Sequence, residues 1–221
     1  MSNTKNRRLS RLILIAVSPF ITCFICCNHP SLKTGVDQKM INTQIDTCNN
    51  PDADINCCFV FMPSELTPVM SIAVQNEPGE KLLITGTIFK SDGVTPYPDV
   101  ILYAYHTDNS GHYSRKGDEN GFQKWHGHLH GWCKTGSNGK YEIQTLRPAR
   151  YPGNTIPAHI HAAFKTAEGQ MDYINDFVFK DDSLVNAKYI SSLAYSGGTG
   201  VVDLKKNAQN IWQGSRDLIL K

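Results

Sequence analysis

The amino-acid sequence predicts an all-β protein, an antiparallel immunoglobulin-like β-sandwich with a short helical segment and long loops. The first reason is a set of short runs rich in β-branched and aromatic residues, which favour strands. The second is the turn-forming sequences SDG, TDNSG, SNG and AEG, which separate these runs. Short strands at such spacing are typical of two antiparallel sheets packed face to face.

Composition limits the class of protein. The chain has 221 residues, 40% hydrophobic and 19% charged, with a formal net charge of +2. At roughly 100 to 200 residues per domain, this length allows one packed domain with an appendage. The first 26 positions hold four basic and no acidic residues, so the remainder has 18 basic and 20 acidic residues, a charge of −2. This balance argues against nucleic acid as a partner, because nucleic-acid binding needs a basic face.

Residues 1–27 have the pattern of a lipoprotein-type export signal. A basic cluster at 5–11 precedes the apolar run Leu12–Cys27. Those 16 residues rise only about 24 Å as a helix, less than the ~30 Å hydrocarbon core of a membrane. Cys27 fits best as the acylated cysteine, with Cys23 and Cys26 as alternatives. We therefore expect an exported lipoprotein facing the periplasm or the exterior and touching the membrane only through its lipid. The alternative is an uncleaved hydrophobic N-terminus.

Residues 28–77 are rich in Asn, Asp, Pro and Ser and show no sustained hydrophobic period, which predicts a tether. An oxidising compartment favours disulfides over reduced thiols. The adjacent Cys57 and Cys58 lack C-x-x-C spacing, which favours a disulfide over a zinc site. With Cys27 acylated, an even set remains whose pairing stays open: Cys48, Cys57, Cys58 and Cys133.

Residues 78–221 form the predicted sandwich domain. Alternation is clearest at 140–145, where Tyr141, Ile143 and Thr145 share one face of the strand. A helical turn or more is expected around 183–193, and the Gly-rich sequence at 196–200 predicts a loop. The predicted strands are 82–89, 100–106, 140–145, 159–164 and 172–179.

His159 and His161 are the most specific candidates for a metal site. Residues i and i+2 of a strand point to the same face, so the sequence PAHIH presents two imidazoles to one point in space. The alternative is an ordinary pair of histidines on a solvent face.

A second alternating group is His126, His128 and His130, which would bind zinc or copper if all three lay on one strand. Gly127 and Gly131 weaken such a strand, so the competing interpretation is that these histidines line a pocket or the surface.

Two of the nine tyrosines lie outside the packing repeats. Tyr113 follows a turn and Tyr151 lies in the Pro-rich sequence RPARYPG, and loop positions of this kind often carry chemistry. Tyr103, Tyr105 and Tyr141 lie within predicted strands and are expected to be core or rim aromatics.

Taken together, residues from about 79 to 179 resemble the intradiol ring-cleavage dioxygenases of the protocatechuate dioxygenase type. The likeness lies in the order of YHTDNSGHYS, then HGHLHGWCKTGSNGKYEIQTLRPARYP, then PAHIH. Members of this family hold non-haem Fe(III) with two tyrosinates and two histidines on a β-sandwich. By that resemblance the metal ligands would be Tyr113, Tyr151, His159 and His161.

The resemblance also implies a reaction. A small aromatic diol of the catechol type binds through both hydroxyls and displaces the axial tyrosinate, which would be Tyr151, while Tyr113 and His161 stay equatorial and His159 axial. O2 then attacks the activated ring, which opens between its two hydroxyl-bearing carbons. The residue types suit a ferric ion, because a hard cation prefers anionic oxygen and its charge lowers a tyrosine pKa from ~10.

Two positions depart from the family pattern. Family members usually have Arg immediately before PAHIH, where this sequence has Ile156, and Asp176 stands where a neutral amide is expected. Losing a preorganised charge in a dry site typically costs ~3 kcal/mol, or about 10²-fold in rate. Arg147 and Arg150 lie upstream in the same loop as candidates to replace it. The sequence therefore supports iron binding more strongly than fast turnover.

Two other function classes compete with this interpretation. The segments at 84–105 and 134–146 also look like transthyretin-like modules of exported proteins, which bind partners or carbohydrate or space domains without catalysis. The PAHIH segment with Tyr113 and Tyr151 argues against a spacer, which has no use for it. The other alternative is a zinc or copper protein built from His126, His128 and His130 with the later pair.

Overall fold

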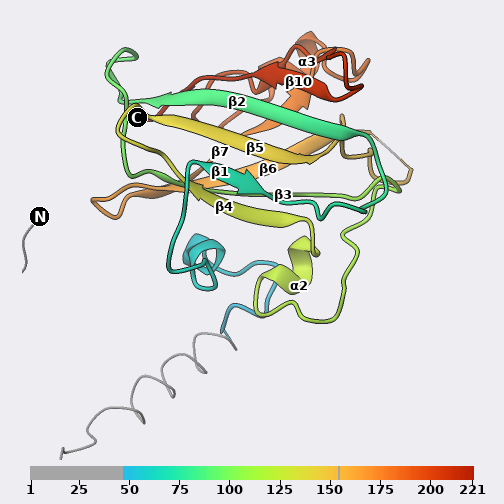
Figure 1. The fold of residues 1–221 in the computed structure, drawn as a ribbon, viewed down its shortest axis with the longest axis horizontal. Coiled ribbons are helices and arrows are strands. Elements are labelled where there is room, and N and C mark those ends of the chain that lie inside the picture. Colours follow the sequence, from blue (N-terminus) through green and yellow to red (C-terminus); the bar gives the residue numbers. More distant parts are fainter. Residues whose placement is uncertain (1–46, 154) are drawn as a thin grey trace, which may run out of the picture.

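Two sheets packed face to face make up most of the part of the chain that the computed structural model describes, residues 47–153 and 155–221 (Figure 1). The predicted export signal and the first part of the predicted tether lie outside these residues. Within them, no helix is long and apolar enough to cross a membrane.

One sheet has the strand order β1-β5-β2-β10-β9, with β11 also pairing with β2. The other has the order β4-β3-β6-β7-β8. The strands of the first sheet are β1 (Val69–Ser71), β2 (Lys81–Phe89), β5 (Lys140–Leu146), β9 (Lys205–Lys206), β10 (Trp212–Ser215) and β11 (Leu218–Ile219). Those of the second are β3 (Ile101–His106), β4 (His130–Lys134), β6 (His159–Lys165), β7 (Met171–Phe179) and β8 (Val201–Val202).

The all-β sandwich predicted from the sequence is confirmed, and all five predicted strands are present within a residue or two of their expected limits. The sheets are mixed, however, rather than purely antiparallel. β1 pairs in parallel with β5, β10 and β11 with β2, and β8 with β7. Each of these short strands reaches its partner after a long connection, which permits a parallel pairing that a tight hairpin does not.

The core lies between the sheets, and a second apolar layer lies outside one of them. Even-numbered residues of β3, such as Leu102 and Ala104, face the main core. Tyr103 faces outward into a second cluster, which includes Phe59 and Phe122. Period-two alternation therefore leaves β3 and β6 apolar on one face and rich in rings on the other.

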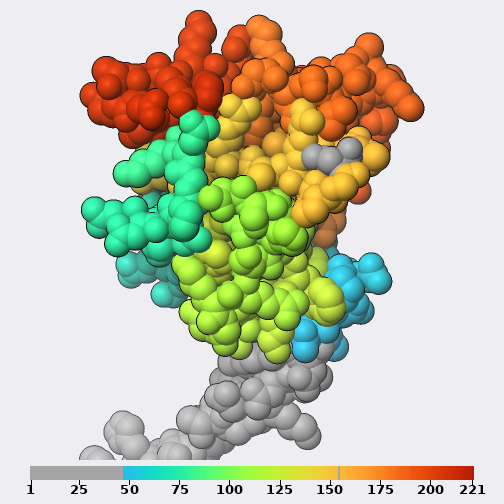
Figure 2. All heavy atoms as spheres, turned by 90° about the vertical axis from the view of Figure 1, so that its right-hand side faces the viewer, coloured from blue at the N-terminus to red at the C-terminus, as the bar shows by residue number. Residues whose placement is uncertain are grey.

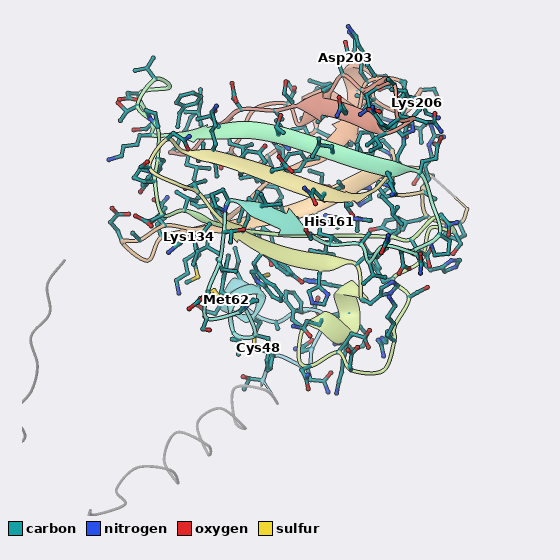
Figure 3. The ribbon with its side chains drawn as sticks, viewed as in Figure 1. Cys48, Met62, Lys134, His161, Asp203 and Lys206 are labelled. Carbon is teal, nitrogen blue, oxygen red and sulfur yellow. A yellow bond between two sulfur atoms is a disulfide. The ribbon has the colours of Figure 1, made fainter. Side chains whose placement is uncertain are left out.

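The outer cluster is covered by the N-terminal part of the described chain. The short 3₁₀ helix η1 (Ile55–Phe59) and α2 (Gln123–His126) lie beneath β4 in the view of Figure 1. A disulfide joins Cys48 to Cys57, while Cys58 and Cys133 are buried free thiols, so the open question of pairing is answered for these four cysteines. In Figure 3, Cys48 marks this lower layer, on the far side of the sheet from the main core.

The segment at 47–77, assigned from its sequence to the tether, packs against the sandwich. Met70 in β1 is fully buried in the main core, and Trp132 Nε1 donates a hydrogen bond of 2.7 Å to the Cys58 carbonyl oxygen. The helix α3 (Ala187–Ser191) lies within the expected helical range, and the Gly-rich sequence after it is a loop with one isolated bridge.

Candidate metal centre

His159 and His161 both lie on the outer face of β6, as their spacing predicts. Their Nε2 atoms are 3.0 Å apart. The other ring nitrogen of each has a fixed partner: His159 Nδ1 lies 2.7 Å from the Pro157 carbonyl oxygen and His161 Nδ1 lies 2.8 Å from Asp176 Oδ1. In Figure 3, His161 lies in the sheet that contains β3 and β4.

These partners determine which nitrogens carry protons. A carbonyl oxygen and a carboxylate can only accept, so each neutral imidazole carries its hydrogen on Nδ1. Both Nε2 lone pairs then face each other across 3.0 Å, an arrangement that a cation between or beside them would stabilise. Such carboxylate and carbonyl partners are typical of metal-binding histidines.

A β-bulge places Asp176 beside His161. Ile160 pairs with Phe177 and Ala162 pairs with Ile174, so β7 has one extra residue over this interval. Bulges of this kind re-aim side chains and often lie next to functional sites. Here the inserted residue lets both Ile174 and Phe177 face the core, while Asp176, next to Phe177, lies on the outer face against His161.

The two candidate tyrosines converge on the same point from separate loops. Tyr151 Oη lies 3.2 Å from His159 Nε2 and 3.2 Å from His161 Nε2. The Tyr113 and Tyr151 hydroxyl groups are in direct hydrogen-bond contact. The structure therefore brings together the side chains of all four predicted ligands. Asp176 joins the two histidines in the one group of His, Cys, Asp and Glu side chains within residues 47–153 and 155–221 that lies close enough to hold an ion.

These spacings suit a single ion. Two donor atoms bound at about 2.1 Å and at right angles lie about 3.0 Å apart. The Nε2 pair and the Tyr151 oxygen are separated by 3.0 to 3.2 Å, so one cation can contact all three. Two phenol oxygens with two imidazoles form a mixed hard-donor set, which suits iron better than a thiol-preferring metal.

Without a cation, burial favours the neutral forms of Tyr113, Tyr151 and His159. Burial raises the pKa of Tyr113 and of Tyr151 above the usual 10, and burial lowers the pKa of His159 below 6.5. A bound metal ion reverses this preference for tyrosine, because its positive charge stabilises the phenolate.

The loops that carry the tyrosines are fastened to each other. Gly111 has φ of 84°, and a Cβ there would lie only 2.1 Å from the Arg150 carbonyl oxygen, so only glycine allows the approach. Thr107 Oγ1 also donates to the Ala149 carbonyl oxygen at 2.7 Å.

The Asp108 side chain closes the turn before Tyr113. It accepts hydrogen bonds from the backbone N–H groups of Ser110 and His112 and from two serine hydroxyls. Figure 2 faces this end of the sandwich, where the green segment lies beside the yellow-orange one.

Asp182 anchors both ends of the loop between Tyr151 and His159. Its carboxylate accepts from Arg150, next to Tyr151, and from the Ala158 N–H at 2.9 Å, next to His159. It also accepts from the Leu184 N–H at 2.9 Å. Sequence reasoning missed this residue because no local pattern links it to the PAHIH segment.

An aromatic ring packs against the His161 imidazole, a contact that the sequence did not reveal. The Tyr105 ring stacks on His161 with ring centroids 4.7 Å apart and on His126 with ring centroids 3.4 Å apart. His126 Nδ1 shares a 2.8 Å hydrogen bond with the buried Tyr103 hydroxyl. Burial lowers the pKa of His126 to about 2, so this ring is neutral.

The second histidine group does not assemble a site. His126 ends α2, whereas His130 begins β4, so the three do not share a strand face. His128 pairs with Glu77 at 2.7 Å and His130 Nδ1 lies 2.7 Å from the Gly127 carbonyl oxygen. The three histidines therefore do not form a site of their own, and His126 is buried while His128 and His130 are partly buried.

The upstream arginines do not replace the charge missing at Ile156. Arg147 donates to Asp181 at 2.7 Å and its guanidinium lies over the Trp212 ring. Arg150 is paired with Asp182. Ile156 itself is 40% exposed.

Comparison with known proteins supports the same family. A family model described as "Dioxygenase" matches residues 60–215. No curated protein sequence matches the chain. The dioxygenase domain of a dioxygenase carbohydrate-binding protein fusion from Streptomyces sp. SirexAA-E is 20% identical, with a TM-score of 0.54 over 73% of this chain and 92% of that one.

Two further solved structures share the fold. Catechol 1,2-dioxygenase from Acinetobacter sp. ADP1 is 21% identical with a TM-score of 0.54, over 72% of this chain and 58% of that chain. An intradiol ring-cleavage dioxygenase from Tetranychus urticae is 19% identical with a TM-score of 0.50, over 72% and 89%. With a family match over most of its length, the chain belongs to the dioxygenase family, as a member of its intradiol ring-cleaving branch.

Proposed function

We propose that the protein is a non-haem Fe(III) dioxygenase that uses O2 to cleave a catechol-type ring between its two hydroxyl-bearing carbons. The observation that carries this proposal is the convergence of Tyr113, Tyr151, His159 and His161 on one point. A ferric ion held there would take both oxygens of the diol and activate its ring toward O2. Family membership supports the reaction class.

The residues of the chain would hold and orient the reactants. Asp176 and the Pro157 carbonyl oxygen fix the two imidazoles with their Nε2 atoms toward the ion. Tyr113 and Tyr151 would supply the anionic oxygens. Since burial raises the pKa of the Tyr151 phenol, the Tyr151 oxygen would serve as the acceptor of a proton from the diol.

Metal content and colour test the proposal. The purified full chain, expressed with sufficient iron, should contain close to one iron per chain and absorb visible light through tyrosinate-to-iron charge transfer. Tyr113→Phe should shift or remove the band, whereas Tyr195→Phe, at a 57% exposed tyrosine, should leave it unchanged. A colourless zinc protein would favour the alternative metal function, and colourless metal-free protein would favour a non-catalytic module.

Turnover is tested separately. Oxygen uptake with catechol and hydroxyquinol should be slow in the natural chain, because Ile156 supplies no charge, and Ile156→Arg should raise it by up to about 10² if the guanidinium reaches the ring. Absence of uptake with every diol, despite bound iron, would reject ring cleavage and leave a binding protein.

We also propose that the protein is exported and lipid-anchored through Cys27. The signal-like pattern of residues 1–27 supports this, and the Cys48–Cys57 disulfide suits an oxidising compartment. Labelled palmitate should enter the natural chain and be absent from Cys27→Ser. Labelling that persists in this variant would assign the lipid to Cys23 or Cys26, and absence of labelling in the natural chain would reject the anchor.

A further inference from the structure

The electrostatics of the centre indicate which diols it accepts. We propose that the site selects catechols by substituent charge, favouring cationic and neutral rings over rings with a carboxylate, and that Asp176 is the specificity-determining residue. This inference rests on the proposed function, because it concerns the substrate of the same site.

The position of Asp176 is the first reason. The bulge in β7 turns its carboxylate toward the metal side of the sheet, where Oδ1 accepts the His161 Nδ1–H at 2.8 Å. Its other oxygen, Oδ2, has no hydrogen-bond partner among the residues that the structure describes, and the side chain is 28% exposed. One unit of negative charge therefore lies directly behind a ligand, with an oxygen left open.

The reach of this charge is the second reason. Asp176 Oδ1 lies 2.8 Å from His161 Nδ1, and Nε2 of the same ring lies 3.0 Å from His159 Nε2 and 3.2 Å from Tyr151 Oη, so one imidazole separates the carboxylate from these donor atoms. These atoms surround the point where the donors converge. A substrate bound there lies in the same field.

The third reason concerns the arginines of the neighbouring segments, of which Arg115, two positions from Tyr113, is exposed with its guanidinium over the Trp125 ring. Arg147 and Arg150 are paired with Asp181 and Asp182, and Ile156 occupies the position before PAHIH. Arg216 is buried on the opposite face of β7, where it stacks on Phe177 and donates to backbone carbonyl oxygens. It offsets Asp176 from behind the sheet and presents no donor to the metal side.

The size of the effect follows from Coulomb's law. For a substituent charge about 7 Å from the Asp176 carboxylate, in a medium with an effective dielectric constant of about 20, one unit of charge changes the dissociation constant of the diol by roughly 50-fold. Partial exposure and salt reduce this value, so we expect a step of at least about tenfold per unit charge at low ionic strength.

Three diols that differ mainly in charge test the proposal: 3,4-dihydroxybenzylamine, 4-methylcatechol and 3,4-dihydroxybenzoate. Each carries one carbon at ring position 4. Their dissociation constants for the iron-loaded full chain would be measured without oxygen, from the change in the charge-transfer band. Affinity should fall in the order amine, methyl, carboxylate, and added salt should weaken the amine and strengthen the benzoate.

Variants separate the effect of the Asp176 charge from the intrinsic affinity of each diol for the iron. Asp176→Asn should reduce the amine-to-benzoate affinity ratio at least about 100-fold, because the two substituents differ by two units of charge. Asp172→Asn, which removes the same charge from an exposed position of the same strand, should leave the ratio unchanged. If Asp176→Asn loses iron, the effect of salt on amine and benzoate binding to the natural chain tests the inference instead. Equal binding of all three diols, with no salt dependence, overturns this inference alone, whereas binding of none also overturns the proposed function.

Discussion

Replacing Asp182 by Asn should strongly destabilise the fold, because one buried carboxylate anchors both ends of the loop between Tyr151 and His159. Its Oδ2 accepts from Arg150 Nε and from the Ala158 N–H, each at 2.9 Å, and its Oδ1 accepts from the Leu184 N–H at 2.9 Å. The side chain is only 5% exposed. An asparagine amide offers one acceptor oxygen, so its NH2 group must face at least one of these donors.

The magnitude follows from the donors left unpaired. Each buried unsatisfied donor costs about 1–3 kcal/mol, and losing one partner of a buried ion pair costs ~3–5 kcal/mol. Arg150 is 34% exposed and can be rehydrated, which lowers the total. We expect Asp182→Asn to reduce the free energy of unfolding by about 3 kcal/mol.

Urea unfolding at neutral pH measures this change, with Asp181→Asn as the control. Asp181 pairs with Arg147 at 2.7 Å but is 50% exposed, so its loss should cost less than about 1 kcal/mol. The ion pair and hydrogen bonds lower the pKa of Asp182, so its contribution is present above pH ~4 and is lost as pH falls through the folded-state pKa. Equal losses in the two variants would refute the reasoning.

Three further predictions concern other parts of the fold. Burial lowers the pKa of His106 to about 4, so unfolding should become easier by about 3 kcal/mol as pH falls from ~6.5 to 4, and His106→Gln should flatten this dependence in urea titrations. Replacing both Cys48 and Cys57 by Ser should lower the free energy of unfolding by ~2.5 kcal/mol relative to the oxidised natural protein, and dithiothreitol treatment of the natural protein should cause the same loss; a larger loss in the variant than on reduction would point to packing instead. Gly111→Ala should lower iron content and the charge-transfer band, because the Arg150 carbonyl oxygen must move, whereas Gly117→Ala, with open space around it, should retain both.

The strands and the histidine pair could be predicted because their signals are local. Alternation along 140–145 places Tyr141 and Ile143 in the core, as expected, and the i, i+2 spacing puts His159 and His161 on one face. Short edge strands such as β8 and β9, with two residues each, carry no such signal and were missed. That the four residues bind iron stays a prediction that metal analysis must test.

Local sequence patterns were enough to predict the sandwich class, the five central strands and the shared face of the two imidazoles, because side-chain direction in a strand depends only on neighbouring residues. Tertiary structure alone decided that Tyr113 meets Tyr151, which requires Gly111 to lie against the Arg150 carbonyl oxygen. It also decided, through the bulge in β7, that Asp176 turns toward His161. Both depend on contacts between segments 15 or more positions apart, and no periodicity within either segment encodes how closely the two approach.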